Sequence, residues 1–203
     1  MSSKADVRRS LEQMSRPSGE FDAQRYFRGD HGLRFYNIGT ENIRSFARSV
    51  YETNRSRWCI DDAMIFAEDL IVDPYLETKS VGIEVVARYR KAFTPKLLPR
   101  WKRWLARNYS ANWATTDAIC GALIGPLLVL YPELADSLRQ WSTHRNIWVR
   151  RASIVGLIPL VRTGMALDVA YDIAATLHPD KEDLIQRQLD GLCAKQARWT
   201  LAV

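Results

Sequence analysis

The sequence predicts an all-α protein built as a right-handed α-solenoid, a stack of paired helices. Three observations lead to this prediction. Segments with apolar residues three and four positions apart run through most of the 203 residues. Strand alternation joined by hairpin turns is absent from the sequence. Helix starts recur at a spacing of roughly 35 residues, which is typical of helical repeats, near Thr40, Leu76, Asn112, Asn146 and Lys181.

Residues 1–39 are expected to form N-terminal helices and a loop. Helix-forming side chains fill the first part of this region, and three glycines then interrupt the pattern. The expected elements are helices at Lys4–Met14 and Glu20–Arg28 and a loop at Gly29–Gly39.

Residues 40–203 are expected to form about five helix pairs, and the whole chain, residues 1–203, to form a single domain. Asp73 precedes Pro74 and ends one helix, because a residue before proline disfavours helical geometry. Ser56 is a candidate cap for the start of that helix. The predicted helices are Thr40–Asn54, Ser56–Val72, Leu76–Phe93, Thr94–Asn108, Asn112–Leu130, Glu133–Ser142, Asn146–Val161, Met165–Leu177 and Lys181–Ala197.

Two architectures are compatible with that pattern. A period that stays in phase over five units is typical of HEAT-like or armadillo repeats. An ordinary helical bundle with helices of similar length is the alternative. In a repeat stack, the second helices of the pairs line one concave face, which suits a long and curved ligand.

The composition points to a polyanionic partner. The net charge is +6 and the pI about 9.4, which favours nucleic acid or an anionic membrane surface, although a basic surface alone is also compatible. The longest apolar run, Ala118–Tyr131, is too short for a membrane span and contains Gly125-Pro126. Met1–Gly19 lacks the apolar segment of a signal peptide. We therefore expect a cytoplasmic protein that does not contact a membrane.

Metal chemistry has no support in the sequence. The cysteines and histidines are isolated, so neither a zinc site nor a disulfide framework is expected. They are Cys59, Cys120, Cys193, His31, His144 and His178.

Positive charge is concentrated in one stretch, because no acidic residue lies between Glu84 and Asp117. Aromatic side chains are interleaved with these cations. Four of the cations share one helical face, where like charges repel by a few tenths of a kcal/mol per pair. Phosphates are the natural partners, although a solvated helix face is the simpler interpretation. The cations proposed to contact DNA are Arg88, Arg90, Lys91, Lys96, Arg100, Arg103 and Arg107, the last four sharing that face.

Asp117 is a carboxylate at the end of this basic stretch. It follows Trp113 by four residues, so both side chains share a helical face, with Asn112 as the expected N-cap. One repeat later come Arg150 and Arg151. Asp117 is expected either to pair with one of these arginines or to stabilise a cationic sugar as an N-glycosidic bond breaks.

At these residues the sequence resembles the AlkD family of bacterial DNA alkylation repair enzymes, the HEAT-like-repeat alkylpurine DNA glycosylases. Trp113–Asp117 resembles a family pattern of tryptophan followed four residues later by aspartate. Asn146–Ile154 is similar to the family segment Asn-Ile-Trp-x-x-Arg-x-x-Ile. Arg25–Arg28 and Phe35–Thr40 resemble its opening helix and loop. The resemblance covers roughly residues 22–188.

The resemblance implies a monofunctional glycosylase that excises cationic N3- or N7-alkylated purines from duplex DNA by hydrolysis, with little or no base flipping. It implies Asp117, Trp113 and Arg151 as catalytic residues and Tyr26 as a DNA-facing residue. Independently of the resemblance, Arg150 is expected to hold a flanking phosphate. It also implies no metal and no cofactor. We expect a monomer in the bacterial cytosol, associated with the nucleoid.

Two other functions stay open. Gly191 stands where the family has a second tryptophan, which favours a non-catalytic module that binds distorted or branched DNA. A scaffold for protein partners is the default for many helical solenoids. The acid-free basic stretch argues against the scaffold.

Overall fold

Helices make up nearly all the regular structure in the computed structural model, which describes residues 3–17, 27 and 32–189. Within these ranges the β structure is limited to an isolated bridge between Arg34 and Tyr75. The predicted all-α class is therefore confirmed. Except for Phe27, the predicted helix Glu20–Arg28 lies outside the described residues, and so do residues 190–197 of the predicted helix Lys181–Ala197.

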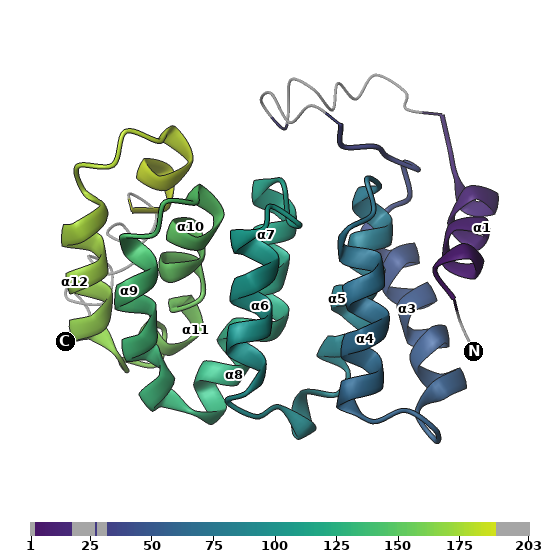
Figure 1. Ribbon diagram of the computed structural model, residues 1–203, viewed down its shortest axis with the longest axis horizontal. Helices are drawn as coiled ribbons and strands as arrows, with labels where there is room; N and C mark the ends of the chain where they lie inside the picture. The colour runs from purple at the N-terminus through teal and green to yellow at the C-terminus, as the bar shows by residue number, and fades with distance from the viewer. Residues whose placement is uncertain (1–2, 18–26, 28–31, 190–203) are drawn as a thin grey trace.

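The helices lie side by side along the length of the molecule (Figure 1). The longer α-helices are α1 (Lys4–Met14), α3 (Thr40–Asn54), α4 (Ile60–Ile71), α5 (Leu76–Ala87), α6 (Leu97–Ala106), α7 (Trp113–Ile119), α10 (Ile147–Val155) and α12 (Leu167–Leu177). Shorter elements are the 3-10 helices η1 (Arg90–Ala92) and η3 (Pro132–Leu138), the π-helix η2 (Cys120–Ile124), and α8 (Gly125–Leu130), α9 (Arg139–Ser142) and α11 (Ile158–Val161). Residues 183–189 form a last helical segment.

Eight of the described helices form two rows, and ion pairs join two pairs of neighbours within each row. We call α4, α6, α9 and α12 the outer row. In it, Arg100 of α6 bonds to two carboxylates of α4, and Arg139 of α9 bonds to two carboxylates of α12. We call α3, α5, α7 and α10 the inner row. In it, Arg44 of α3 bonds to Glu84 of α5, and Arg151 of α10 bonds to Asp117 of α7. Neighbouring helices thus pack against one another within each row, while the right-handed α-solenoid stays a prediction.

The basic helix α6 contributes one face to the core. Trp101 and Trp104 are fully buried, and Trp101 packs edge-on against Phe93 with 5.2 Å between ring centroids. The cations of α6 lie on its other faces, and Lys102 sits over the ring of Trp141 in α9. The aromatic residues of the basic stretch therefore belong mainly to the hydrophobic core.

Several predicted helices end earlier or are interrupted, and the causes are local. The predicted helix Leu76–Phe93 ends at Ala87. The predicted helix Asn146–Val161 breaks after Val155, because Pro159 cannot donate a backbone hydrogen bond. Ser56 is not the cap of α4. Cys59 is the N-cap, and its backbone N–H donates to Asp62 at 2.8 Å.

The predicted helix Asn112–Leu130 is one continuous rod with a wider turn in its middle. Pro126 lacks an N–H and its ring would clash with the carbonyl four residues earlier. The rod relieves this by adopting π geometry in η2, between α7 and α8. The π turn begins three residues after Asp117.

This rod, Trp113–Leu130, is also long and apolar enough to cross a membrane by length and composition, with a mean hydropathy of 1.6 over 18 residues. The rod begins five residues before the apolar run Ala118–Tyr131, which by itself was too short for a membrane span. Half of it is buried, and α5 and α10 pack against it within the stack. Packing in the hydrophobic core therefore accounts for its apolar character.

Candidate functional site

Two asparagines start α7 and α10 in the same way. The side chain of Asn112 accepts a hydrogen bond from the N–H of Thr115 at 2.7 Å, and that of Asn146 accepts one from the N–H of Trp148 at 2.8 Å. The predicted Asn112 cap is confirmed, and Asn146 is a second cap of the same residue type. Because the two helices begin alike in adjacent repeats, side chains at matching positions lie opposite each other.

Asp117 and Arg151 occupy such matching positions and form a two-pronged ion pair. Arg151 Nε lies 2.8 Å from Asp117 Oδ1, and Arg151 Nη2 lies 2.8 Å from Asp117 Oδ2. The Arg151 side chain is 3% exposed, whereas that of Asp117 is 29% exposed. The pair therefore turns its negative end toward solvent and keeps its positive end in the core.

Arg151 also fixes the next repeat. Its Nη1 donates to the backbone carbonyl of Leu184, in the helical segment at residues 183–189. One guanidinium thus connects α7, α10 and the last described segment. The orientation of the Asp117 carboxylate consequently depends on three successive units of the stack.

Trp113 lies one turn before Asp117 and is half-buried at the start of α7. Its ring stacks on Phe27 with 5.8 Å between centroids, and Phe27 stacks on Phe35 at 5.3 Å. The predicted residue Tyr26 lies outside the described residues. The sequence analysis did not predict that Phe27 stacks on Trp113, although it singled out the neighbouring aromatic residue Tyr26.

A cavity of about 610 Å³ opens beside Asp117, between α3, α5 and the rod of α7 and η2. Its wall on the rod consists of small residues. Its charged lining, within the described residues, comprises three carboxylates and one guanidinium. The small residues are Ala114, Ala118, Gly121 and Ala122, and the charged residues are Glu77, Glu84, Asp117 and Arg44.

Glu77 is the most buried of these carboxylates, at 3% exposure. Its Oε1 accepts hydrogen bonds from the backbone N–H groups of Tyr36 at 3.0 Å and Ile38 at 3.3 Å. Its Oε2 is buried without a hydrogen-bond donor in the described part of the chain. No sequence signal indicated Glu77, because its partners are backbone groups of a distant loop.

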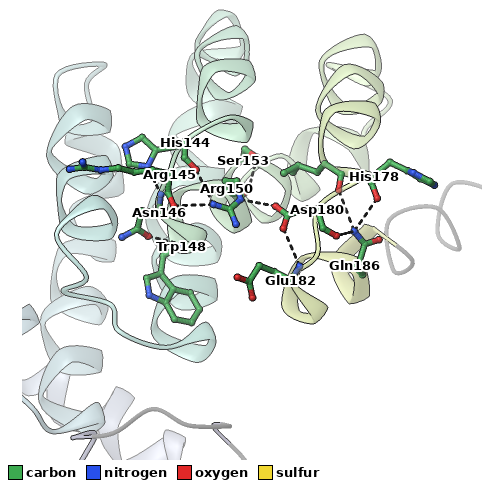
Figure 2. A network of polar contacts seen from close by, with 11 residues as sticks. His144, Arg145, Asn146, Trp148, Arg150, Ser153, His178, Asp180, Glu182 and Gln186 are labelled. Carbon is green, nitrogen blue, oxygen red and sulfur yellow. Dashed lines mark hydrogen bonds and ion pairs between the residues drawn. The ribbon is translucent and has the colours of Figure 1, made fainter.

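Arg150 belongs to a different network from Arg151. Its Nε lies 2.7 Å from Asp180, and its Nη1 donates to the carbonyls of His144 and Arg145. Figure 2 shows this network between the start of α10 and the 178–186 segment. Arg150 thus connects α10 to the segment that contains Asp180, and the Asp180 carboxylate balances its charge.

The four cations predicted to share a helical face lie in or next to the outer row. Arg100 bonds to Asp61 and Glu68 of α4, each at 3.0 Å. None of the four lines the 610 Å³ cavity. Lys96, Arg103 and Arg107 are exposed.

The other three predicted cations lie near the end of α5. Arg90 and Lys91 line a second cavity, of about 450 Å³, which shares Gly121 with the first. Arg88 is half-buried and donates to the carbonyl of Arg44 at 3.2 Å. Arg90 and Lys91 are therefore the predicted cations whose cavity adjoins the one beside Asp117.

Nucleophilic and metal groups are scarce around the site. Within the described ranges, no three metal-ligating side chains cluster. Cys120 follows Asp117 by one turn and is fully buried. Burial, and secondarily the charge of Asp117, raises the pKa of its thiol well above the usual value. Cys120 is accordingly held as the neutral thiol.

The fold and site define an all-helical protein with an arginine-anchored carboxylate beside a cavity between α3, α5 and the rod. The profile of a family described as "DNA alkylation repair enzyme" matches residues 7–189, and the chain belongs to this family. Membership supports a role in DNA repair with DNA as the binding partner.

A solved structure shows the same fold. The chain is similar to a structure titled "Predicted DNA alkylation repair enzyme from Enterococcus faecalis", with a TM-score of 0.73 and 14% identity, over 86% of this chain and 79% of that chain. Among curated proteins, the comparison finds no match.

Proposed function

We propose that the protein is a monofunctional DNA glycosylase of the bacterial cytosol that hydrolyses the N-glycosidic bond of cationic N3- or N7-alkylated purines in duplex DNA. One observation carries the proposal. The partly exposed Asp117 carboxylate, anchored from behind by buried Arg151, stands one turn from Trp113 at the edge of the cavity. All these groups belong to one chain, so a monomer suffices.

The chemistry requires only electrostatic assistance. An alkylated purine carries positive charge, and it leaves as a neutral base when the glycosidic electron pair moves onto its nitrogen. The positive charge then resides on the sugar, as in other glycosyl transfers. Asp117 stabilises this cation, and water adds to the sugar carbon and releases a proton. The Arg151 fork holds the carboxylate in one orientation, so little reorganisation is needed.

Trp113 contributes an aromatic ring next to that carboxylate. The face of an indole ring attracts cations, and stacking on Phe27 fixes the ring. The ring and the carboxylate together favour positive charge on the base before the bond breaks and on the sugar afterwards.

DNA is proposed to bind through its phosphates. The exposed predicted contacts are Arg90, Lys91, Lys96, Arg103 and Arg107. Arg100 and Arg150 are already paired with carboxylates, so they contribute less to DNA affinity than the exposed cations. Arg90 and Lys91 adjoin the cavities, whereas the other three exposed cations lie in or next to the outer row, so the two sets can be tested separately.

The decisive assay uses a duplex with a single N7-methylguanine, in which abasic sites are counted. Asp117→Asn keeps size and removes the charge, so excision should fall on the order of 10²-fold or more. DNA affinity should be unchanged or higher, because a negative charge has been removed. Asp168→Asn, an exposed outer-row change, is the matched control. Loss of excision and binding together with a lower melting temperature would make Asp117 a structural residue only.

A non-catalytic module for distorted or branched DNA is the second candidate. It is favoured by the pairing itself, because both Asp117 oxygens accept hydrogen bonds from Arg151 and the charge is compensated. Excision at the spontaneous rate, together with tighter binding of a four-way junction than of a linear duplex, would support this function and exclude the glycosylase.

A further inference from the structure

We propose that the cavity beside Asp117 receives a positively charged substituent of the alkylated base, an alkyl chain that ends in an ammonium group, and that Glu84 and Glu77 recognise it. The inference rests on the proposed function, because the lesion must be presented at Asp117.

The size of the cavity exceeds what a methylated base requires. Its volume is about 610 Å³, within the range of roughly 300–1,000 Å³ that is common for small-molecule sites. The small side chains of the rod keep this space open on the α7 side. A methyl group beside Asp117 leaves most of the volume unused, so the space suits a longer substituent.

The shape of the cavity leads from Asp117 to α5. Glu77, Ser80 and Glu84 line it and share one face of α5, since their spacing is three and four residues. Packed helix axes lie roughly 8–10 Å apart. A group held at Asp117 therefore faces the carboxylates of α5 across a gap that a short alkyl chain can cross.

The charge of the cavity opposes that of the molecule. The chain carries a net charge of +6, yet the described lining has three carboxylates and one guanidinium. Glu84 is 27% exposed and its partner Arg44 is 64% exposed. Because exposed pairs are weak and easily exchanged, a ligand cation can replace Arg44. A phosphate would be repelled from the same position.

Glu77 supplies an independent sign of a missing donor. Its Oε1 is satisfied by two backbone N–H groups, but its buried Oε2 has no donor in the described residues. Leaving a buried acceptor unpaired costs about 1–3 kcal/mol. Because Glu77 lines the cavity, a small movement of this wall would let a cationic N–H donor in the cavity reach the atom.

The test compares two duplexes that differ in one terminal group, N7-(2-aminoethyl)guanine and N7-(2-hydroxyethyl)guanine, both corrected for spontaneous base loss. The two substituents are nearly isosteric, and only the first carries an ammonium group. Wild-type protein should show a kcat/KM ratio on the order of fivefold in favour of the aminoethyl lesion. Glu84→Gln should reduce this ratio to about one, because only the aminoethyl lesion loses a charged partner.

Two further variants make the test specific. Glu77→Gln keeps an oxygen for the two backbone donors and removes the charge, so it should also lower the ratio. Glu52→Gln removes an exposed acid of α3 that bonds to Arg55 outside the cavity, and it should leave the ratio unchanged. If both Glu84→Gln and Glu77→Gln keep the wild-type preference for the aminoethyl lesion, the inference is wrong.

Equilibrium binding of the same duplexes separates this inference from the proposed glycosylase. A protein that only binds phosphates should bind the aminoethyl duplex more weakly, because the ammonium reduces its negative charge. Tighter binding that is lost in Glu84→Gln supports the cavity site even if no base is released, in which case only the glycosylase proposal fails. Excision of both lesions at equal rates removes the cavity site and leaves the glycosylase.

Discussion

Among single residues, the geometry of Arg151 sets the orientation of Asp117. A guanidinium presents several N–H groups in a fixed plane, and here they serve both carboxylate oxygens and the Leu184 carbonyl at once. Lysine keeps the charge but offers a single nitrogen.

Arg151→Lys should therefore lower the free energy of unfolding by about 2–4 kcal/mol, because buried groups lose their partners. Urea denaturation gives this value. Arg139→Lys is the control in the outer row, where the partner carboxylates are exposed, and it should change stability by less than about 1 kcal/mol. Equal effects of the two substitutions would mean that the hydrogen bonds of buried Arg151 stabilise the fold no more than an exposed ion pair does.

His144 makes stability depend on pH. Partial burial, followed by the charges of Lys102, Arg145 and Arg150, lowers its pKa below the ordinary 6.5. Its Nδ1 accepts a hydrogen bond from the N–H of Asn146, which requires the neutral ring. Below about pH 6.5 the unfolded chain gains a proton that the folded chain does not, so stability falls as pH falls.

His144→Asn keeps an acceptor near that position and cannot titrate. Its free energy of unfolding should decrease less than that of wild type between about pH 7.5 and 5.5, as measured by urea denaturation at both values. Identical decreases in the two proteins would show that His144 is protonated equally in both states.

The sequence defined part of this site and left part of it undetermined. The spacing of Trp113, Asp117 and Arg151 within the repeat was enough to predict that they approach one another. It did not reveal which arginine meets Asp117. Successive helical side chains point about 100° apart, so Arg150 turns to Asp180 while Arg151 turns back to Asp117. Only the packing of three repeats decides between them.

Among the elements, the rod of α7, η2 and α8 carries Asp117 and also packs closely against α11. Gly125 has no room for a side chain, because a Cβ there would lie 2.6 Å from Pro159. Gly121, four residues earlier, faces open space at the junction of the two cavities. The periodic pattern predicted the rod, but its contact with α11 depends on where Gly125 meets Pro159 in space.

The two glycines should respond oppositely to alanine. Gly125→Ala should lower the free energy of unfolding by about 1–3 kcal/mol through overpacking. Gly121→Ala should raise it by up to about 1 kcal/mol, since alanine has the higher helix propensity. Thermal and urea denaturation of the single variants would test both signs. A stabilised Gly125→Ala variant would mean that Pro159 moves aside without cost.

In the whole molecule, a continuous basic stretch of sequence is divided between two surfaces. The acid-free residues between Glu84 and Asp117 include the end of α5 in the inner row, all of α6 in the outer row and the start of α7. The sequence predicted the paired helices and the surplus of charge. It did not place that charge relative to Asp117, because the connections between helices carry the chain from one row to the other.

This division gives a direct test of where duplex DNA binds. Arg90→Glu/Lys91→Glu and Lys96→Glu/Arg103→Glu change the net charge equally, so long-range attraction of DNA is matched. If DNA lies over the inner-row cavities, the first pair should weaken binding strongly and lower the slope of log affinity against log salt by about 2, since roughly one counterion is released per phosphate contact. The second pair should weaken binding only modestly. Fluorescence anisotropy at several salt concentrations, with circular dichroism to check helicity, provides the measurement. A larger loss for the α6 pair would place the DNA on the outer row, away from Asp117, and the proposed excision chemistry would then have no access to its substrate.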